Sequence, residues 1–210
     1  MKTLKNKFNT LFFLIIIGIS LVSCSKDDDN DPSGDSKGGQ ATALIEIDNQ
    51  TIQFSAKTGN SFAAITKTQF GENEFNQLTV VMMDDNSDVT IATQVVPAPD
   101  NPIDYDLSNV GLGTDDFFTT SVAVEGENSS DNNIYGVGFY QQGEEVVIKS
   151  KGSFKITSLT KTNIRGTFEM TLYNSYDPNN AQDAKKLTVT EGEFDLPMLS
   201  QAEIEDLGLN

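Results

Sequence analysis

The alternation that decides the fold class runs through residues 146–172, VVIKSKGSFKITSLTKTNIRGTFEMTL. In its first half the even positions Val146, Ile148, Phe154 and Ile156 are apolar, and the odd positions Lys149, Lys151 and Lys155 are basic. After a short polar segment the apolar series resumes with Ile164, Gly166, Phe168, Met170 and Leu172. Because side chains of a β-strand alternate between two faces, this pattern predicts antiparallel strands with one buried and one solvated face.

A hairpin joins the two halves of this stretch in our interpretation. A three-residue loop at residues 161–163 ends in asparagine, which tolerates the left-handed conformation. Such a loop pairs Ile156 with Phe168. It also pairs Lys155 with Glu169, so that both faces of the hairpin match.

Similar short runs continue outward from this hairpin, from residue 41 to residue 197. They are separated by Gly, Asn and Asp clusters at the spacing expected of an all-β protein. Further strands are predicted at residues 43–47, 51–56, 62–68, 78–83, 89–95, 117–124, 134–140 and 186–196. We therefore predict a single all-β domain at residues 41–198, either an antiparallel β-sandwich or a barrel-like sheet.

The first two predicted strands form a hairpin around residues 49–50. A two-residue loop there places Ile47 opposite Ile52. It also places Ile45 opposite Phe54, which brings all four apolar side chains to one face.

Prolines and polar clusters mark the connections between strands. Three prolines at positions 97, 99 and 102 lead us to predict that residues 96–116 are mostly loop. Residues 174–184 are also predicted to be a loop. Residues 200–207 are predicted to form a short capped helix or a frayed tail, within a C-terminal tail at residues 199–210.

The N-terminus has the composition of a secretory signal peptide. Lys2, Lys5 and Lys7 precede an apolar run at residues 11–22, LFFLIIIGISLV. This run is shorter than the roughly 20 residues that a helix needs to cross a bilayer. We therefore expect residues 1–23 to be a cleaved signal peptide.

The end of the apolar run, LVSC at residues 21–24, resembles the lipobox of bacterial lipoproteins. The resemblance implies cleavage between Ser23 and Cys24, a diacylglyceryl group on the sulfur of Cys24 and an acyl chain on its amine. Three acyl chains hold a protein firmly on a membrane, whereas one chain binds only reversibly. Since Cys24 is the single cysteine, the sequence excludes an intrachain disulfide.

The residues after this cysteine resemble the export signal of lipoproteins in Bacteroidota-type bacteria. In that signal a lysine followed by acidic residues directs display on the outer face of the outer membrane. The matching residues are Lys26, Asp27, Asp28 and Asp29, for which an acidic linker is the alternative interpretation. Residues 24–40 have no apolar residue after the cysteine, so we expect a flexible, disordered tether between the lipid and the domain.

The strands resemble a set of uncharacterised surface-exposed lipoprotein ectodomains from the same bacterial group. The matching patterns are G-x-F-x-I-T at residues 152–157, I-x-G-T-F at residues 164–168 and T-x-G-x-F at residues 190–194, together with the first hairpin. This resemblance implies a β-rich ectodomain and brings no assigned activity.

Composition excludes several classes of function. The chain has no histidine, which excludes Ser-His-Asp and Cys-His catalysis and removes the commonest zinc ligand. Its net charge of −17 becomes −20 when the three signal-peptide lysines are removed, and so acidic a protein repels nucleic acid. We predict no enzymatic activity, no cofactor and no nucleic-acid partner, with a glycosidase-like carboxylate pair as the remaining catalytic alternative.

Calcium is an alternative because it binds carboxylate and carbonyl oxygens. Asp84, Asn86 and Asp88 match the first ligand positions of an EF-hand loop. However, Val89 and Val95 stand where that loop needs glycine and a bidentate glutamate, and a hairpin turn accounts for the same residues. Further candidates are Asp100, Asp104, Asp106, Asp115 and Asp116.

Aromatic side chains are candidates for a glycan or peptide site. They are Tyr105, Tyr173 and Tyr176 in or near loops, and the close group of Tyr135, Phe139 and Tyr140. Tryptophan, the usual sugar platform, is absent. Lys149, Lys151 and Lys155 are interpreted as a solvated sheet face with acidic neighbours.

Two hypotheses follow from the sequence. The first is a lipid-anchored, outward-facing outer-membrane lipoprotein whose non-enzymatic domain binds a glycan, peptide, small apolar ligand or envelope protein. The second is a structural or protective coat lipoprotein without a discrete site, in which the acidic surface is the functional feature. A calcium-dependent adhesin and a carboxylate-based glycosidase are further alternatives.

Overall fold

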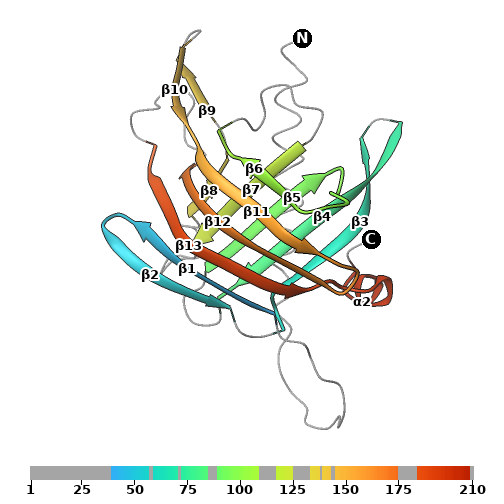
Figure 1. Cartoon of the computed structure of the whole chain (residues 1–210). Coiled ribbons are helices and arrows are strands. Elements are labelled where there is room, and N and C mark those ends of the chain that lie inside the picture. The colour runs from blue at the N-terminus through green and yellow to red at the C-terminus, as the bar shows by residue number, and fades with distance from the viewer. Residues whose placement is uncertain are drawn as a thin grey trace. The chain divides into compact units, whose positions relative to one another are not determined.

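A curled antiparallel sheet forms the domain in the computed structural model (Figure 1). The structure describes residues 39–56, 59–70, 72–84, 89–108, 117–124, 133–137, 139–142, 145–174 and 184–208. Within these ranges, no helix is long and apolar enough to span a membrane. The sheet belongs to a compact unit that runs from Ser36 to Asn210.

The strands are β1 (Gln40–Ile47), β2 (Gln50–Ala56), β3 (Phe62–Phe70), β4 (Asn73–Met83), β5 (Val89–Val96), β6 (Ile103–Asp106), β7 (Phe117–Val124), β8 (Asn133–Gly136), β9 (Phe139–Gln142), β10 (Glu145–Lys149), β11 (Lys151–Leu159), β12 (Asn163–Asn174) and β13 (Lys186–Pro197). The main sheet has the order β2-β1-β13-β12-β8-β7-β5-β4-β3. β11 pairs with β12 and carries β6 on its other edge, whereas β9 and β10 form a separate two-stranded sheet. The all-β prediction is confirmed, and the sheet curls into a half-barrel.

The predicted buried face of the long hairpin is confirmed. The inward side chains of β11 and β12 that are buried are Phe154, Ile156, Ile164, Phe168, Met170 and Leu172. They share one core with residues of β4, β5 and β7. The side chains of Val146 and Ile148 lie outside the described part of the chain.

The pairing of β11 with β12 differs from the predicted register by two residues. Phe168 lies opposite Phe154, and Gly166 takes the place opposite Ile156. Lys155 correspondingly faces a threonine instead of the predicted glutamate.

The turn between these strands explains the shift. The Thr160 amide donates to the Asn163 carbonyl (2.9 Å), and the Thr160 hydroxyl accepts from the Asn163 amide (3.0 Å), so the turn spans four residues. Asn163 already belongs to β12 and does not adopt the left-handed conformation. Because a shift of two residues returns each side chain to the same face, the burial pattern was predicted correctly with a wrong register.

The hairpin of β1 and β2 shows the same kind of error. Its turn lies at residues 48–49, whose φ values are 48° and 63°, one residue earlier than predicted. A type I′ turn needs positive φ at both central residues, which aspartate and asparagine tolerate better than glutamine. Ile45 therefore lies opposite Ile52, and Phe54 lies opposite Ala43.

Two predicted strands are divided in the structure. The strand predicted at residues 134–140 becomes β8 and β9, which belong to different sheets. The first half of the long hairpin becomes β10 and β11, which are also in different sheets. Gly152, near the start of β11, has a φ of 111°, which L-amino acids with side chains rarely adopt, and a Cβ atom there would clash with the backbone of Glu169.

Strand β6 lies inside residues 96–116, which were predicted to be mostly loop. It pairs with β11, with Ile103 opposite Ile156 and Tyr105 opposite Phe154. A proline directly precedes β6 and does not prevent it, because among the described strands β6 uses only one edge. Its inward side chains are half-buried against the core.

Two glycines and two phenylalanines join β12 to β13. Gly166 lies opposite Phe194, and Phe168 lies opposite Gly192. A Cβ atom on Gly166 would clash with the Phe194 ring and the Lys155 carbonyl oxygen, and one on Gly192 would clash with Phe168. Each ring therefore packs over the bare backbone of a glycine in the neighbouring strand. We call these two contacts the Gly–Phe pairs.

A short helix, α2 (Gln201–Asp206), follows β13 and confirms the predicted capped helix. The Glu203 carboxylate accepts hydrogen bonds from the Ser200 hydroxyl (2.6 Å) and amide (2.7 Å), and these bonds lower the pKa of Glu203. Just before the helix, the Leu199 amide donates to the Ala63 carbonyl of β3 (2.8 Å).

Candidate functional site

Several sequence-predicted site residues lie outside the described ranges. Those of the lipid anchor and export signal are Ser23, Cys24, Lys26, Asp27, Asp28 and Asp29. Among the calcium candidates they are Asn86, Asp88, Asp115 and Asp116.

The calcium candidate Asp84 is buried at the end of β4, where its carboxylate binds the backbone. Its Oδ2 atom accepts a hydrogen bond from the Ser55 amide of β2 (2.6 Å), and its own amide donates to the Val89 carbonyl (2.9 Å). Since β2 is an edge among the described strands, this bond satisfies an amide beside which no described strand pairs. Strands β4 and β5 pair on either side of this segment, as the hairpin interpretation requires.

The calcium candidates Asp104 and Asp106 lie on the outer face of β6. Asp104 is opposite Lys155 of β11. Two hydrogen bonds lower the pKa of the Asp106 carboxyl: the larger effect comes from the Ser108 side chain and the smaller from the Ser108 amide. Within the described part of the chain, no three acidic, histidine or cysteine side chains are grouped so that they could hold a metal ion.

Five aromatic rings form a column through the core. The ring of Tyr105 stacks on Phe118 with centroids 4.7 Å apart, and Phe118 lies 5.9 Å from Phe154. Phe154 in turn lies 5.2 Å from Phe194 and 6.2 Å from Phe168. The column connects β6 and β7 with β11, β12 and β13, so its ring contacts help to hold these parts of the curled sheet together.

Tyr135, considered for a glycan site, is fully buried in the core. Its hydroxyl has no hydrogen-bond partner among the described residues. Burial raises the pKa of this phenol above its ordinary value of 10.0, and the negative charge of Asp48 makes a smaller contribution in the same direction. The position therefore serves core packing. The side chains of Phe139, Tyr140 and Tyr176 lie outside the described part.

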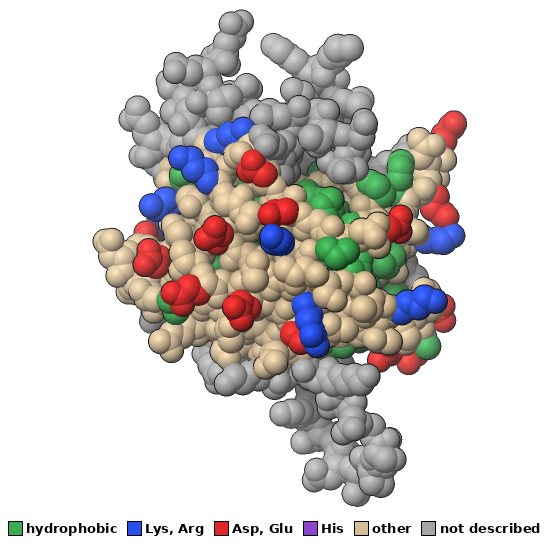
Figure 2. Space-filling model, in the orientation of Figure 1, with side chains coloured by type: hydrophobic (Ala, Val, Ile, Leu, Met, Phe, Trp, Pro, Cys, Tyr) green, Lys and Arg blue, Asp and Glu red, His purple; other side chains and the backbone are tan. Residues whose placement is uncertain are grey.

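The lysines of β11 lie on a mixed polar face. Lys151 and Lys155 are exposed, and on the neighbouring strands the Arg165 Nε atom lies 2.8 Å from Asp195 Oδ2. Figure 2 shows acidic and basic side chains scattered over the surface. The predicted solvated face is confirmed for Lys151 and Lys155, and Lys155 lies opposite the acidic Asp104, whereas Lys149 is half-buried at the end of β10 in the other sheet.

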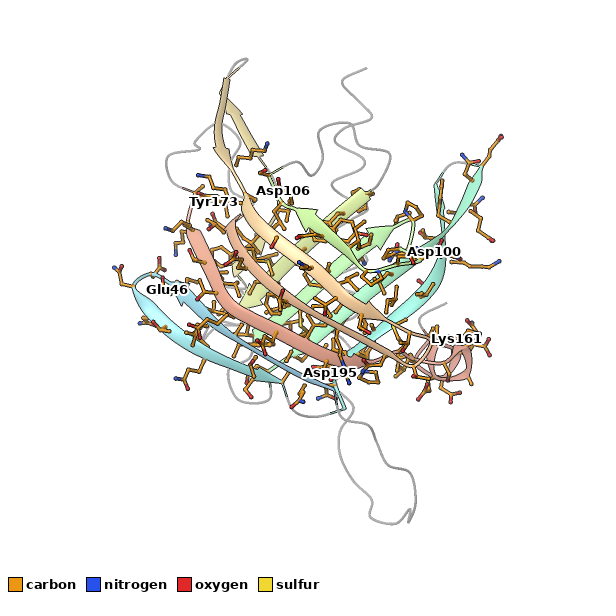
Figure 3. All side chains as sticks on the ribbon, viewed as in Figure 1. Glu46, Asp100, Asp106, Lys161, Tyr173 and Asp195 are labelled. Atoms are coloured by element: carbon orange, nitrogen blue, oxygen red, sulfur yellow. The ribbon has the colours of Figure 1, made fainter. Side chains whose placement is uncertain are left out.

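A group of half-buried apolar side chains comes from β3, β6 and β11 and from the segments that follow β5 and β13. It consists of Ile65, Ala98, Ile103, Leu159 and Met198, and we call it the β3–β6 seam. All five pack against the core and retain partial exposure. Figure 2 shows apolar side chains gathered in the region where Figure 3 labels Asp100.

The chain itself crosses this seam at residues 97–102. The Ala98 amide donates to the Asn76 carbonyl of β4 (2.7 Å), and the segment then leads into β6, which pairs with β11. The segment at residues 97–102 therefore links β4 to β11 through β6, and the apolar side chains of the seam stay half-buried.

Strand β3 borders the seam and is the last strand of the sheet. It pairs with β4 along its whole length, from Phe62 opposite Val81 to Phe70 opposite Asn73. On its other edge, the described part of the chain pairs with it only at Ala63.

Comparison of the chain with protein-family models, curated proteins and solved structures found no match.

The seam residues carried no signal in the sequence. Ile65 and Ile103 belong to ordinary apolar runs, and their half-exposed state depends on which strands end the sheet. The half-buried position of Ile103 was also missed because it depends on β6, a strand that the sequence did not predict.

Proposed function

We propose that this chain is a lipid-anchored lipoprotein, displayed on the outer face of the outer membrane, whose domain is a non-enzymatic binding module. The address rests on Cys24 and on Lys26 with its three following aspartates. The lack of histidine supports a role without catalysis, because the commonest general base is absent.

The β3–β6 seam is the observation that carries the binding role. Its half-buried apolar side chains offer contact area, and the adjacent β3 edge offers backbone hydrogen-bonding groups. Exposed Asp100 and Asp104 lie near it in the chain and contribute a polar rim. An apolar centre with a polar rim is typical of interaction surfaces.

A pair of matched variants tests the binding role. Ile103→Lys places a charge in the seam, whereas Leu207→Lys places the same charge at an exposed position on the tail of α2. The full-length proteins are immobilised in detergent and exposed to envelope extract and to a glycan array. We expect a ligand retained by wild type and Leu207→Lys and lost by Ile103→Lys. If the wild type retains no ligand from the envelope extract or the glycan array, the proposal is contradicted.

The address has its own test. Palmitate labelling of the full-length chain should disappear in Cys24→Ser, because the thioether needs the sulfur atom. Protease treatment of intact cells should remove the domain from the wild type, and should spare it when Lys26 and the following aspartates are replaced by serine. Complete protection of the wild type would refute outward display.

The coat lipoprotein is the second candidate, favoured by the acidic surface. Residues 41–140 carry 2 basic and 15 acidic residues, which suits a role in keeping a crowded surface soluble. A deletion strain with impaired envelope integrity, which Ile103→Lys fully restores, would favour this candidate over the binding module. Calcium titration calorimetry tests the adhesin alternative.

A further inference from the structure

The backbone of β3 presents alternate residues to its open edge. The Ala63 carbonyl accepts from the Leu199 amide, so it points away from β4. In a β-strand the amide and carbonyl of one residue point to the same side, and the next residue points to the other side. Ile65, Lys67 and Gln69 therefore direct their amides and carbonyls toward the open edge, while the even-numbered residues face β4.

The chain already places one of its own segments on this edge. Met198 forms a parallel bridge with Ala63, and Leu199 supplies the hydrogen bond. The pairing then stops, because Ser200 caps α2 and the chain turns into the helix. The edge is thus able to accept a strand, and the described part of the chain covers only its first position.

Charge and side chains around the edge define what fits there. Ile65 is half-buried in the seam, so an added strand with an apolar side chain would cover it. Lys67 is paired with Glu74 (2.7 Å), whereas Glu72 is exposed in the hairpin that follows β3. With a whole-chain charge of −17, a second copy is repelled and a basic segment is attracted.

We propose that the β3 edge from Ile65 to Gln69 binds an extended, basic peptide segment of a partner protein by strand addition. Backbone hydrogen bonds would supply the binding energy, and an apolar side chain over Ile65 would set the register. This inference rests on the proposed binding role and names its partner class.

A synthetic peptide tests the inference on the full-length protein in detergent micelles. The probe is acetyl-KVKIKV-amide, which alternates basic and apolar side chains. We expect binding to slow amide hydrogen exchange at Ile65, Lys67 and Gln69 by at least about fivefold, because strand addition protects the outward amides. Unchanged exchange at saturating peptide would overturn the inference.

Two control peptides separate strand addition from charge attraction. The same sequence N-methylated at every residue keeps the charges and lacks amide donors, and we expect it to bind at least about tenfold more weakly. The sequence with glutamate in place of lysine should bind more weakly by a similar factor. Equal binding by the N-methylated peptide would overturn strand addition, and equal binding by the acidic peptide would overturn the basic partner.

A variant pair provides a second readout. Lys67→Pro removes the outward amide and leaves the pairing with β4 intact, so we expect it to lose the probe, whereas Lys67→Ala should retain it. Thermal unfolding checks that both fold, and if Lys67→Pro does not, the N-methylated peptide decides alone.

If an envelope ligand binds the seam without protecting the edge, the inference fails and the proposed function stands. If the probe protects the edge but envelope extract and glycans give no ligand, the proposed function fails and the edge chemistry stands.

Discussion

Strands β13 and β3 differ in how completely their edges and side chains are used. β13 lies between β12 and β1, and the Gly–Phe pairs fill the space between it and β12. Among the described residues β3 pairs along its length with β4 and on its other edge only at Ala63, and Ile65 beside that edge is half-buried. In the region of β13, both edges of the strand are paired and its rings are packed. In the region of β3, backbone groups and a half-buried apolar side chain remain with which a partner can bond and pack.

The largest effect should come from removing a ring of the closed region. Phe194 is buried, lies over Gly166 and stacks with Phe154. We expect Phe194→Ala to lower the free energy of unfolding by about 4 kcal/mol, measured by urea denaturation. Leu207→Ala, at an exposed position, is the control and should change it by less than about 0.5 kcal/mol.

A methyl group added to the same region should also be costly. Gly166→Ala forces the new Cβ against the Lys155 carbonyl and the Phe194 ring, and we expect a loss of about 3 kcal/mol. Gly59→Ala is the control, because nothing lies within 4 Å of a Cβ built there. Similar stability of the two variants in urea denaturation would show that the Gly–Phe pairs are not tightly packed.

Truncation in the open region should cost much less. We expect Ile65→Ala to lower the free energy of unfolding by about 1.5 kcal/mol, because a half-buried side chain loses only part of the burial energy of a core residue. Urea denaturation measures this loss. A loss as large as that of Phe194→Ala would mean that the seam is closed and would remove the contrast between the two regions.

Tyr135→Phe should stabilise the protein, by about 1 kcal/mol, because it removes a buried hydroxyl without a described partner. Burial raises the pKa of the folded phenol above 10.0, so the unfolded chain ionises first as the pH rises. The wild type therefore keeps its stability below pH 10 and loses it above, and the variant lacks this loss. Thermal denaturation at pH 8 and pH 10.5 should show a widening difference, whereas a constant one would contradict the shift.

Side-chain periodicity predicted the faces of the strands well. Phe154, Phe168 and Leu172 were placed in the core by alternation alone, because that alternation has a period of two and survives a register error of two residues. The registers themselves depended on turn conformations at residues 48–49 and 160–163, where hydrogen bonds and φ values override loop-length rules.

The candidate site was beyond prediction from the sequence for a different reason. Whether Ile65 and Ile103 lie at a surface depends on which strands end the sheet, and this order is set by contacts between residues far apart in the chain. Strand β6 was missed because Pro102 suggested a loop, although an edge strand tolerates a proline at its start.

Amide hydrogen exchange along β3 in the ligand-free, full-length protein tests the contrast most directly. The account predicts alternation: slow exchange at the even-numbered residues 64, 66 and 68, which face β4, and fast exchange at Ile65, Lys67 and Gln69, which face the open edge. Uniformly slow exchange along the strand would contradict it, because the edge would then already be covered.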